Sequence, residues 1–194
     1  MTSYTLIAPP TSLRFREMEP KELERYFAWF LASIPERIEV LSTHVRSSEP
    51  FSSWIPDRSP ESLGALGEWF THTVTLRQRT TEEIQGIYAK GPDWFTQVEV
   101  PGEELTEETF SLAMDIGMYL GEILRQSATR LQWKALKGNK QEADYGQPIL
   151  QPFKGGLVCN PVRLAITLAY GLADGTYKGT RLRELYETWR ARTE

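Results

Sequence analysis

The chain has 194 residues and a formal net charge of −4, and 40% of its residues are hydrophobic. This length suits one globular domain whose core needs no disulfide or metal, and the single cysteine, Cys159, excludes an internal disulfide. The acidic balance argues against nucleic-acid binding, and the lack of a signal-peptide pattern or of a long apolar run argues against secretion or a membrane span, so we expect a cytoplasmic protein.

The N-terminal part of the chain predicts an extended arm and then a long amphipathic helix. Residues 1–19 include two adjacent prolines and little periodicity, which predicts an extended N-terminal arm. Pro20 suits the first position of a helix, and apolar residues then recur at spacings of three and four. We expect Pro35 to bend or restart that helix, because proline cannot donate the backbone hydrogen bond.

The next region predicts a loop and two further helix starts. Residues 47–60 contain three prolines and five serines, which is typical of a loop. Ser59-Pro60 has the pattern of a helix cap followed by a first helical proline. Thr80 and Glu83 have the spacing of a capping box, so we expect a short helix or turn after Thr80.

The region from Thr106 to about residue 127 predicts the longest and most central helix. Its apolar residues occupy two faces, which is typical of a helix surrounded by other elements. Gly117 and Gly121 lie on one face, and each lowers helix propensity by about 1 kcal/mol relative to alanine. The pair therefore predicts close approach by a neighbouring element.

The last third predicts a β-hairpin and two helices. LQWKAL (131–136) alternates like a strand, and QPILQPFK (147–154) is a second strand limited to an edge by its prolines, which predicts a hairpin over about 131–154. Asn160-Pro161 predicts the start of a helix, and a final helix is expected over 180–192. The predicted fold class is α+β, a predominantly helical single domain spanning residues 1–194.

The sequence has none of the common catalytic or metal-binding signatures, so we predict no catalytic residues, no metal and no cofactor. His44 and His72 lie in different predicted helices. Asp115 and Glu122 share a helix face and could be a catalytic pair only in a cleft; structural carboxylates are the alternative. Cys159 is either a nucleophile near a base or, as we favour, a small buried residue at a helix entry.

The most one-sided charge distribution predicts a protein-binding surface. No Lys or Arg occurs from Gly91 through Leu124. An acidic patch speeds association with a basic partner, although solvated acids without a partner are the alternative. Trp54 and Trp94 lie outside the helical stripes and are candidate exposed anchors, unless they fold back onto the core. The candidate partner-binding residues are Asp93, Glu99, Glu103, Glu104, Glu107, Glu108, Trp54 and Trp94.

Three blocks together resemble a known group of proteins. They are YFAWFLASIPERIEVL (26–41), DIGMYLGEILRQ (115–126) and the run from LQWKAL through YGQPILQPF to NPVRLAITLA (131–169). The combination is similar to a group of uncharacterised small bacterial cytosolic proteins that resemble immunity proteins, which are encoded beside secreted antibacterial toxins. Within such a group we expect residues 46–60 and 138–146 to vary and to carry partner specificity.

The resemblance implies an immunity-type protein that binds a cognate toxin domain and neutralises it by protein–protein interaction. It implies no catalytic residues. Two alternatives stay open from the residues themselves. One is a small hydrolase or modification-reversing enzyme that uses scattered carboxylates, and the other is a non-catalytic regulatory homo-oligomer, because the sequence is silent on oligomeric state.

Overall fold

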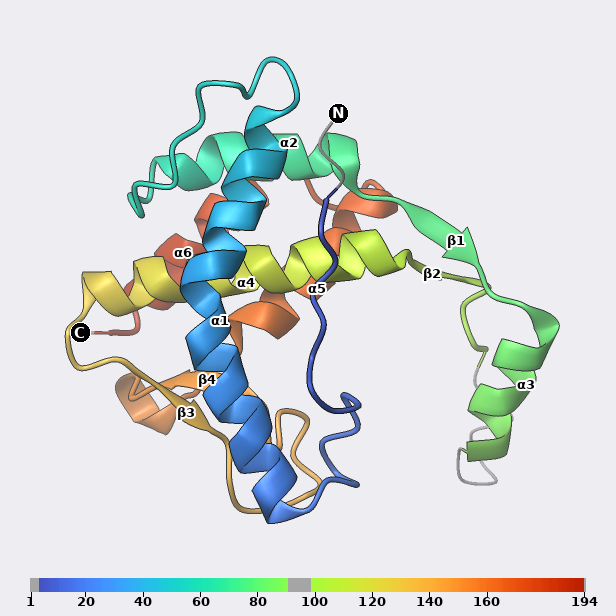
Figure 1. Ribbon diagram of the computed structural model, residues 1–194. Coiled ribbons are helices and arrows are strands. Elements are labelled where there is room, and N and C mark those ends of the chain that lie inside the picture. The colour runs from blue at the N-terminus through green and yellow to red at the C-terminus, as the bar shows by residue number, and fades with distance from the viewer. Residues whose placement is uncertain (1–3, 91–98, 194) are drawn as a thin grey trace.

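Helices build most of this protein, and one of them lies at its centre. A computed structural model describes residues 4–90 and 99–193, and within these ranges it has six α-helices and two antiparallel strand pairs (Figure 1). The central helix is α4 (Glu107–Ser127), which packs against α1 (Pro20–Arg46), α5 (Pro161–Ala173) and α6 (Arg181–Arg190). The remaining large helix, α2 (Ser62–Thr73), packs on α5 and α6. The predicted helix-dominated α+β fold is confirmed.

Helix α1 runs unbroken through Pro35, so the expected restart there is wrong. It begins at Pro20 after a capping box formed by Glu19 and Glu22, and its 27 residues make it longer than α4, which has 21. Pro35 removes the hydrogen bond to the carbonyl of Leu31. Leu31 and Pro35 are both exposed, so water can satisfy the freed carbonyl and the helix continues.

Helix α4 is central because the chain covers it on nearly all sides. The Thr106 hydroxyl accepts a hydrogen bond from the Thr109 backbone N–H and caps the helix, and fifteen of the 21 residues are buried. The predicted close approach at its glycines is confirmed. A Cβ on Gly117 would lie 2.5 Å from Val162 Cα, where α5 begins, and a Cβ on Gly121 would overlap the Trp133 ring. Gly117 therefore leaves room for the start of α5, and Gly121 leaves room for the indole of Trp133.

The predicted late hairpin is confirmed as β3 (Gln132–Ala135) and β4 (Pro148–Gln151), which pair antiparallel. Leu150 of β4 exchanges both backbone hydrogen bonds with Cys159 on the side away from β3. Asn160 then caps α5, as predicted, by accepting a hydrogen bond from the Arg163 backbone N–H. Its Nδ2 also donates to Asp144 and Gln147, so one side chain ties the hairpin loop to the start of α5.

A second strand pair forms a projection that the sequence did not predict. β1 (Leu76–Gln78) pairs with β2 (Glu103–Leu105), and α3 (Thr81–Lys90) lies between them in the chain. The capping box of Thr80 and Glu83 is confirmed at the start of α3. Figure 1 shows this unit extending away from the other helices, and none of the α3 residues is buried. We call the described residues 75–90 and 99–106 "the projection".

The N-terminal arm lies along the helices. Residues 4–19 contain no helix or strand, and Tyr4 and Ile7 both bond to Ser111 of α4. Met18 is buried near the start of α1. Within the described part of the chain, no helix combines the length and the apolar character that a membrane crossing requires.

Candidate functional site

Four of the predicted partner-binding acids lie together where the projection joins α4. Glu103 and Glu104 lie on β2, and Glu107 and Glu108 form the first turn of α4. Glu99 precedes β2 and is exposed. Asp93 and Trp94 lie outside the described residues. The acids at the helix start are also stabilised by the partial positive charge at the N-terminus of α4.

Arginines on β1 neutralise part of this acidic cluster. Arg77 lies opposite Glu104 in the strand pair and contacts it, and Arg77 also bonds to Glu83 at 2.7 Å. Arg79 Nε lies 3.1 Å from Glu104 Oε2. The hydrogen bond from Arg77 lowers the pKa of the Glu83 carboxyl to about 2. Glu104 is thus an internal partner of two arginines and contributes little negative charge to the surface.

Four of the predicted acids are exposed: Glu99, Glu103, Glu107 and Glu108. Glu103 accepts a hydrogen bond from Gln78 at 2.7 Å, and Glu107 is close enough to Arg77 to act on its pKa. The acidic surface is therefore smaller than the sequence window suggested, because strand pairing brings in charges from 25 residues away.

Trp54 is a core residue, so the expectation that it is exposed is wrong. Its side chain is 5% exposed, its Nε1 donates to the Ser62 carbonyl at 3.0 Å, and its ring meets Tyr119 edge-on at 5.6 Å. The alternative weighed for this loop aromatic, folding back onto the core, is the one observed. The indole can be buried at little cost because its N–H is hydrogen-bonded inside the protein.

The acid Asp115 belongs to a filled and buried polar network. Arg37 donates to both Asp115 oxygens at 2.8 Å, and the Tyr4 hydroxyl donates to Asp115 Oδ2 at 2.5 Å. Tyr4 also bonds to Ser111 at 2.9 Å. Burial raises the pKa of the Asp115 carboxyl and of the Tyr4 hydroxyl. Asp115 is fully buried, so this network holds the N-terminal arm, α1 and α4 together.

Glu122 lies in a separate buried cluster. Its carboxylate accepts hydrogen bonds from Arg125 Nη2 at 2.8 Å and from Trp133 Nε1 at 2.9 Å. Burial acts to raise the pKa of Glu122, but these two donors outweigh it and the pKa is lowered. Because Asp115 and Glu122 each have their own cationic partner, they do not form the paired carboxylates of an acid–base site.

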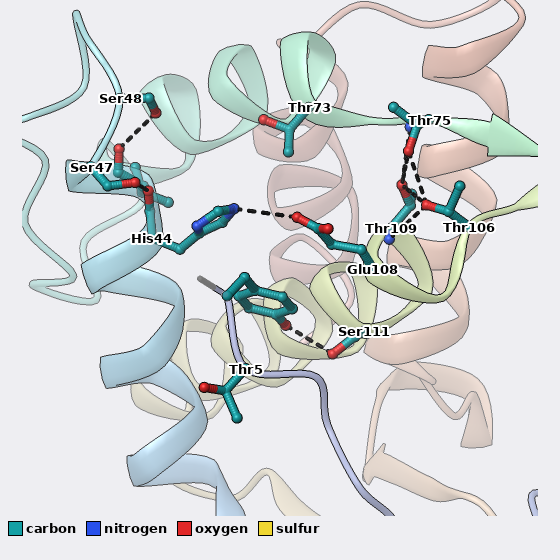
Figure 2. Close-up of polar contacts among 12 residues, drawn as sticks. Thr5, His44, Ser47, Ser48, Thr73, Thr75, Thr106, Glu108, Thr109 and Ser111 are labelled. Atoms are coloured by element: carbon teal, nitrogen blue, oxygen red, sulfur yellow. Dashed lines mark hydrogen bonds and ion pairs between the residues drawn. The ribbon is translucent and has the colours of Figure 1, made fainter. Parts of the chain in front are cut away.

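His44 is the histidine that lies closest to an acid of the cluster (Figure 2). Its Nε2 lies 3.8 Å from Glu108 Oε1. Its ring packs against the rings of Tyr4 and Trp69. Its Nδ1 is buried and has no hydrogen-bond partner among the residues that the structure describes. Burial lowers the pKa of His44, although Glu108 opposes this effect. His72 is exposed and lies 3.4 Å from Glu68.

Three threonine hydroxyls at the base of the projection bond to one another, and the thiol of the single cysteine is buried. Thr75, Thr106 and Thr109 bond to one another at 2.9–3.2 Å where the projection meets α4 (Figure 2). Cys159 is fully buried, and burial raises the pKa of its thiol, which opposes thiolate formation. Cys159 thus fits the favoured interpretation of a small buried residue. Across residues 4–90 and 99–193, no group of three or more His, Cys, Asp or Glu is arranged to hold a metal ion.

A groove that sequence reasoning missed lies between α1 and the β3–β4 hairpin. Its volume is about 700 Å³, within the range of ligand and peptide sites. Its walls include Pro20, Leu23 and Phe27 of α1, Trp133 and Ala135 of β3, and Tyr145 of the hairpin loop. The groove could not be predicted from the sequence, because its walls come from three separate segments. Two partial indications were present in the sequence: the strand-like alternation of residues 131–136 and the expected variability of residues 138–146.

Comparisons of the sequence and the structure with known proteins found no relative. No protein-family model, no curated protein and no solved structure matches this chain.

Proposed function

We propose that this chain is an immunity-type protein of the cytoplasm that binds a cognate toxin domain and neutralises it by protein–protein contact. The observation that carries the proposal is the projection, which extends from the helical body (Figure 1) and includes the exposed acids Glu99 and Glu103. The sequence blocks that resemble the immunity-like group support the same function.

The helix of the projection supports a binding role. α3 has ten residues and buries none of them, and isolated helices of this length are marginally stable in water. Ile84 and Ile87 are only half-buried, on neighbouring turns of the helix. A partner that covers this face would bury apolar area and would stabilise α3 at the same time.

The charge of the projection supports a basic partner. Glu99 and Glu103 are exposed on the strand side, and Glu107 follows at the start of α4. Exposed charges of one sign at the rim of an interface mainly raise the association rate and make it sensitive to salt. Toxin domains that act on nucleic acids or nucleotides need basic surfaces to hold their substrates, so such a domain is the partner class we favour.

The hydrolase alternative has less support from the geometry. Asp115 and Glu122 are buried beside their own arginine partners, and neither lines the groove between α1 and the β3–β4 hairpin. A catalytic carboxylate must reach its substrate within hydrogen-bonding distance.

The homo-oligomer alternative is tested by the molar mass of the protein in solution, which light scattering measures.

The test is binding to the product of the adjacent gene, followed by a charge-reversal series. The two proteins are co-expressed and co-purified, and the association rate is measured at several salt concentrations. Glu99→Lys/Glu103→Lys should slow association on the order of tenfold at low salt and should flatten the salt dependence. Glu104 is left unchanged, because its substitution would break the internal contacts to Arg77 and Arg79.

The matched control is Glu36→Lys/Glu39→Lys on the exposed face of α1. Both double variants change the net charge by four units, from −4 to zero, and each removes one surface contact, from Gln78 to Glu103 or from Arg46 to Glu39. They are therefore matched in net charge and differ in where the charge is placed. The control should associate at nearly the wild-type rate. A neighbouring product that is not a toxin and does not bind would refute the proposed function, and equal effects of the two variants would exclude the projection as the docking surface.

A further inference from the structure

The groove beside β3 carries an inference that does not depend on the acidic projection. We propose that it binds an extended, acidic segment of a protein partner, which adds a strand to the free edge of β3. Three features of the groove favour such a segment: the unpaired backbone of β3, a preorganised apolar wall and the charge of the rim.

The backbone of β3 has one free edge. Leu150 lies opposite Trp133 and uses both its backbone groups to bond to Cys159, on the far side of β4. In an antiparallel ladder the backbone groups of such a pair point away from each other. The N–H and C=O groups of Trp133, and those of Ala135 two residues on, therefore point away from β4. No backbone hydrogen bond between described residues outside the regular elements uses them.

The wall next to this edge is apolar and rigid. The Trp133 indole fills the space left by Gly121, bonds to Glu122 at 2.9 Å and meets Phe30 edge-on at 5.2 Å. Leu23 packs close to Gly146, which has a positive φ of 75°. A preformed wall lowers the entropy lost when a peptide binds, because few side chains must be ordered.

The rim favours acidic residues. The charged residues that line the groove are Lys134, Lys137 and Glu24, a local balance of +1 on a chain whose net charge is −4. An edge lysine discourages pairing with neutral or basic strands. An acidic strand, in contrast, would place carboxylates beside Lys134 and Lys137 while its alternate side chains enter the apolar groove.

The size of the site fits a short strand. β3 has four residues, which at about 3.3 Å per residue gives an edge of about 13 Å. The occupant is therefore a segment of about four to six residues in which apolar and acidic residues alternate. The neighbouring loop is within residues 138–146, the region where the sequence predicted partner specificity.

The test uses a capped hexapeptide, (Val-Glu)3, with a fluorescent label. We expect it to bind the wild-type chain, and we expect the amides of Trp133 and Ala135 to become protected from hydrogen exchange. Lys134→Glu should weaken binding about tenfold, whereas Lys178→Glu, an exposed lysine in the α5–α6 connection, should not change it. Ala135→Pro removes an outward N–H without touching the β3–β4 ladder and should also weaken binding.

Several outcomes would overturn the proposal. They are the absence of binding at about 1 mM peptide, equal binding of (Val-Lys)3, and equal binding of (Val-Glu)3 with N-methylated amides. A Lys134→Glu chain that folds and binds like the wild type also excludes the site, even if Ala135→Pro fails to fold. Self-association through β3 in place of peptide binding would identify a second copy as the occupant and refute a separate partner.

Discussion

Gly117 offers the sharpest test of how the core is built, because alanine at this position should reverse its usual effect in a helix. Gly→Ala inside a helix normally stabilises by up to about 1 kcal/mol. At Gly117 the added Cβ would lie 2.5 Å from Val162 Cα and 2.9 Å from the Pro161 carbonyl oxygen. These are backbone atoms of α5, so no side-chain rotation can relieve the overlap.

The magnitude follows from the overlap. Carbon atoms in contact are normally about 3.5–4.0 Å apart, so the start of α5 must shift by about 1 Å. Overpacking of a well-packed core destabilises by about 1–3 kcal/mol, which exceeds the gain in helix propensity. Because backbone atoms must move by about 1 Å, the cost should lie in the upper part of this range, at about 2–3 kcal/mol. Subtracting the gain of about 1 kcal/mol in helix propensity, we expect Gly117→Ala to lower the free energy of unfolding by about 1–2 kcal/mol.

Urea unfolding followed by circular dichroism measures this effect, and an unchanged slope shows that only stability has changed. Gly64→Ala in α2 is the matched control, because a Cβ there meets nothing within 4 Å and the substitution should stabilise by up to about 1 kcal/mol. If Gly117→Ala is as stable as the wild type, the contact between α4 and the start of α5 is not as close as described.

Two further predictions concern the buried polar groups. Arg37→Met should destabilise the protein by about 3–5 kcal/mol in urea unfolding, because it leaves the buried Asp115 carboxylate without its cation. Adding Asp115→Leu should recover part of that loss. A double variant that is no more stable than the single variant would contradict this prediction. The lowered pKa of His44 means that the unfolded chain takes up the proton first as the pH falls through about 6.5, so this histidine makes stability decrease from about pH 7 towards pH 5. His44→Phe should flatten that slope in thermal unfolding, and an identical slope in His44→Phe would rule out this histidine as the source.

Local signals predicted most of the fold. Thr106, Asn160 and the Thr80–Glu83 pair start helices where the sequence placed them, because a capping hydrogen bond depends on residues only three positions apart. The hairpin was predictable from the alternation of its strands. The error at Pro35 arose because the fate of a proline in a helix depends on whether the freed carbonyl faces water, which is a tertiary property.

The candidate surface was harder to predict because its charges pair across the chain. Arg77 and Glu104 lie 27 positions apart in sequence, and β1 and β2 have three residues each, too few to give an alternating pattern. The partner of Asp115 comes from 78 positions away. Spacing along the sequence can identify an acidic window, but the arginines that neutralise it become visible only when the strands are paired.

The position of α4 has a consequence for how the protein is made. A ribosome releases the chain from the N-terminus, yet the Gly117 face of α4 packs closely on Pro161 and Val162, more than forty residues later. The N-terminal arm, α1, the Trp54 loop and Trp133 are made before that point, but α5 and α6, which cover the rest of α4, are not. This interval exposes Leu, Ile and Met side chains to other nascent chains. Synthesis slowed before residue 161 should therefore lengthen the period in which general chaperones bind this protein.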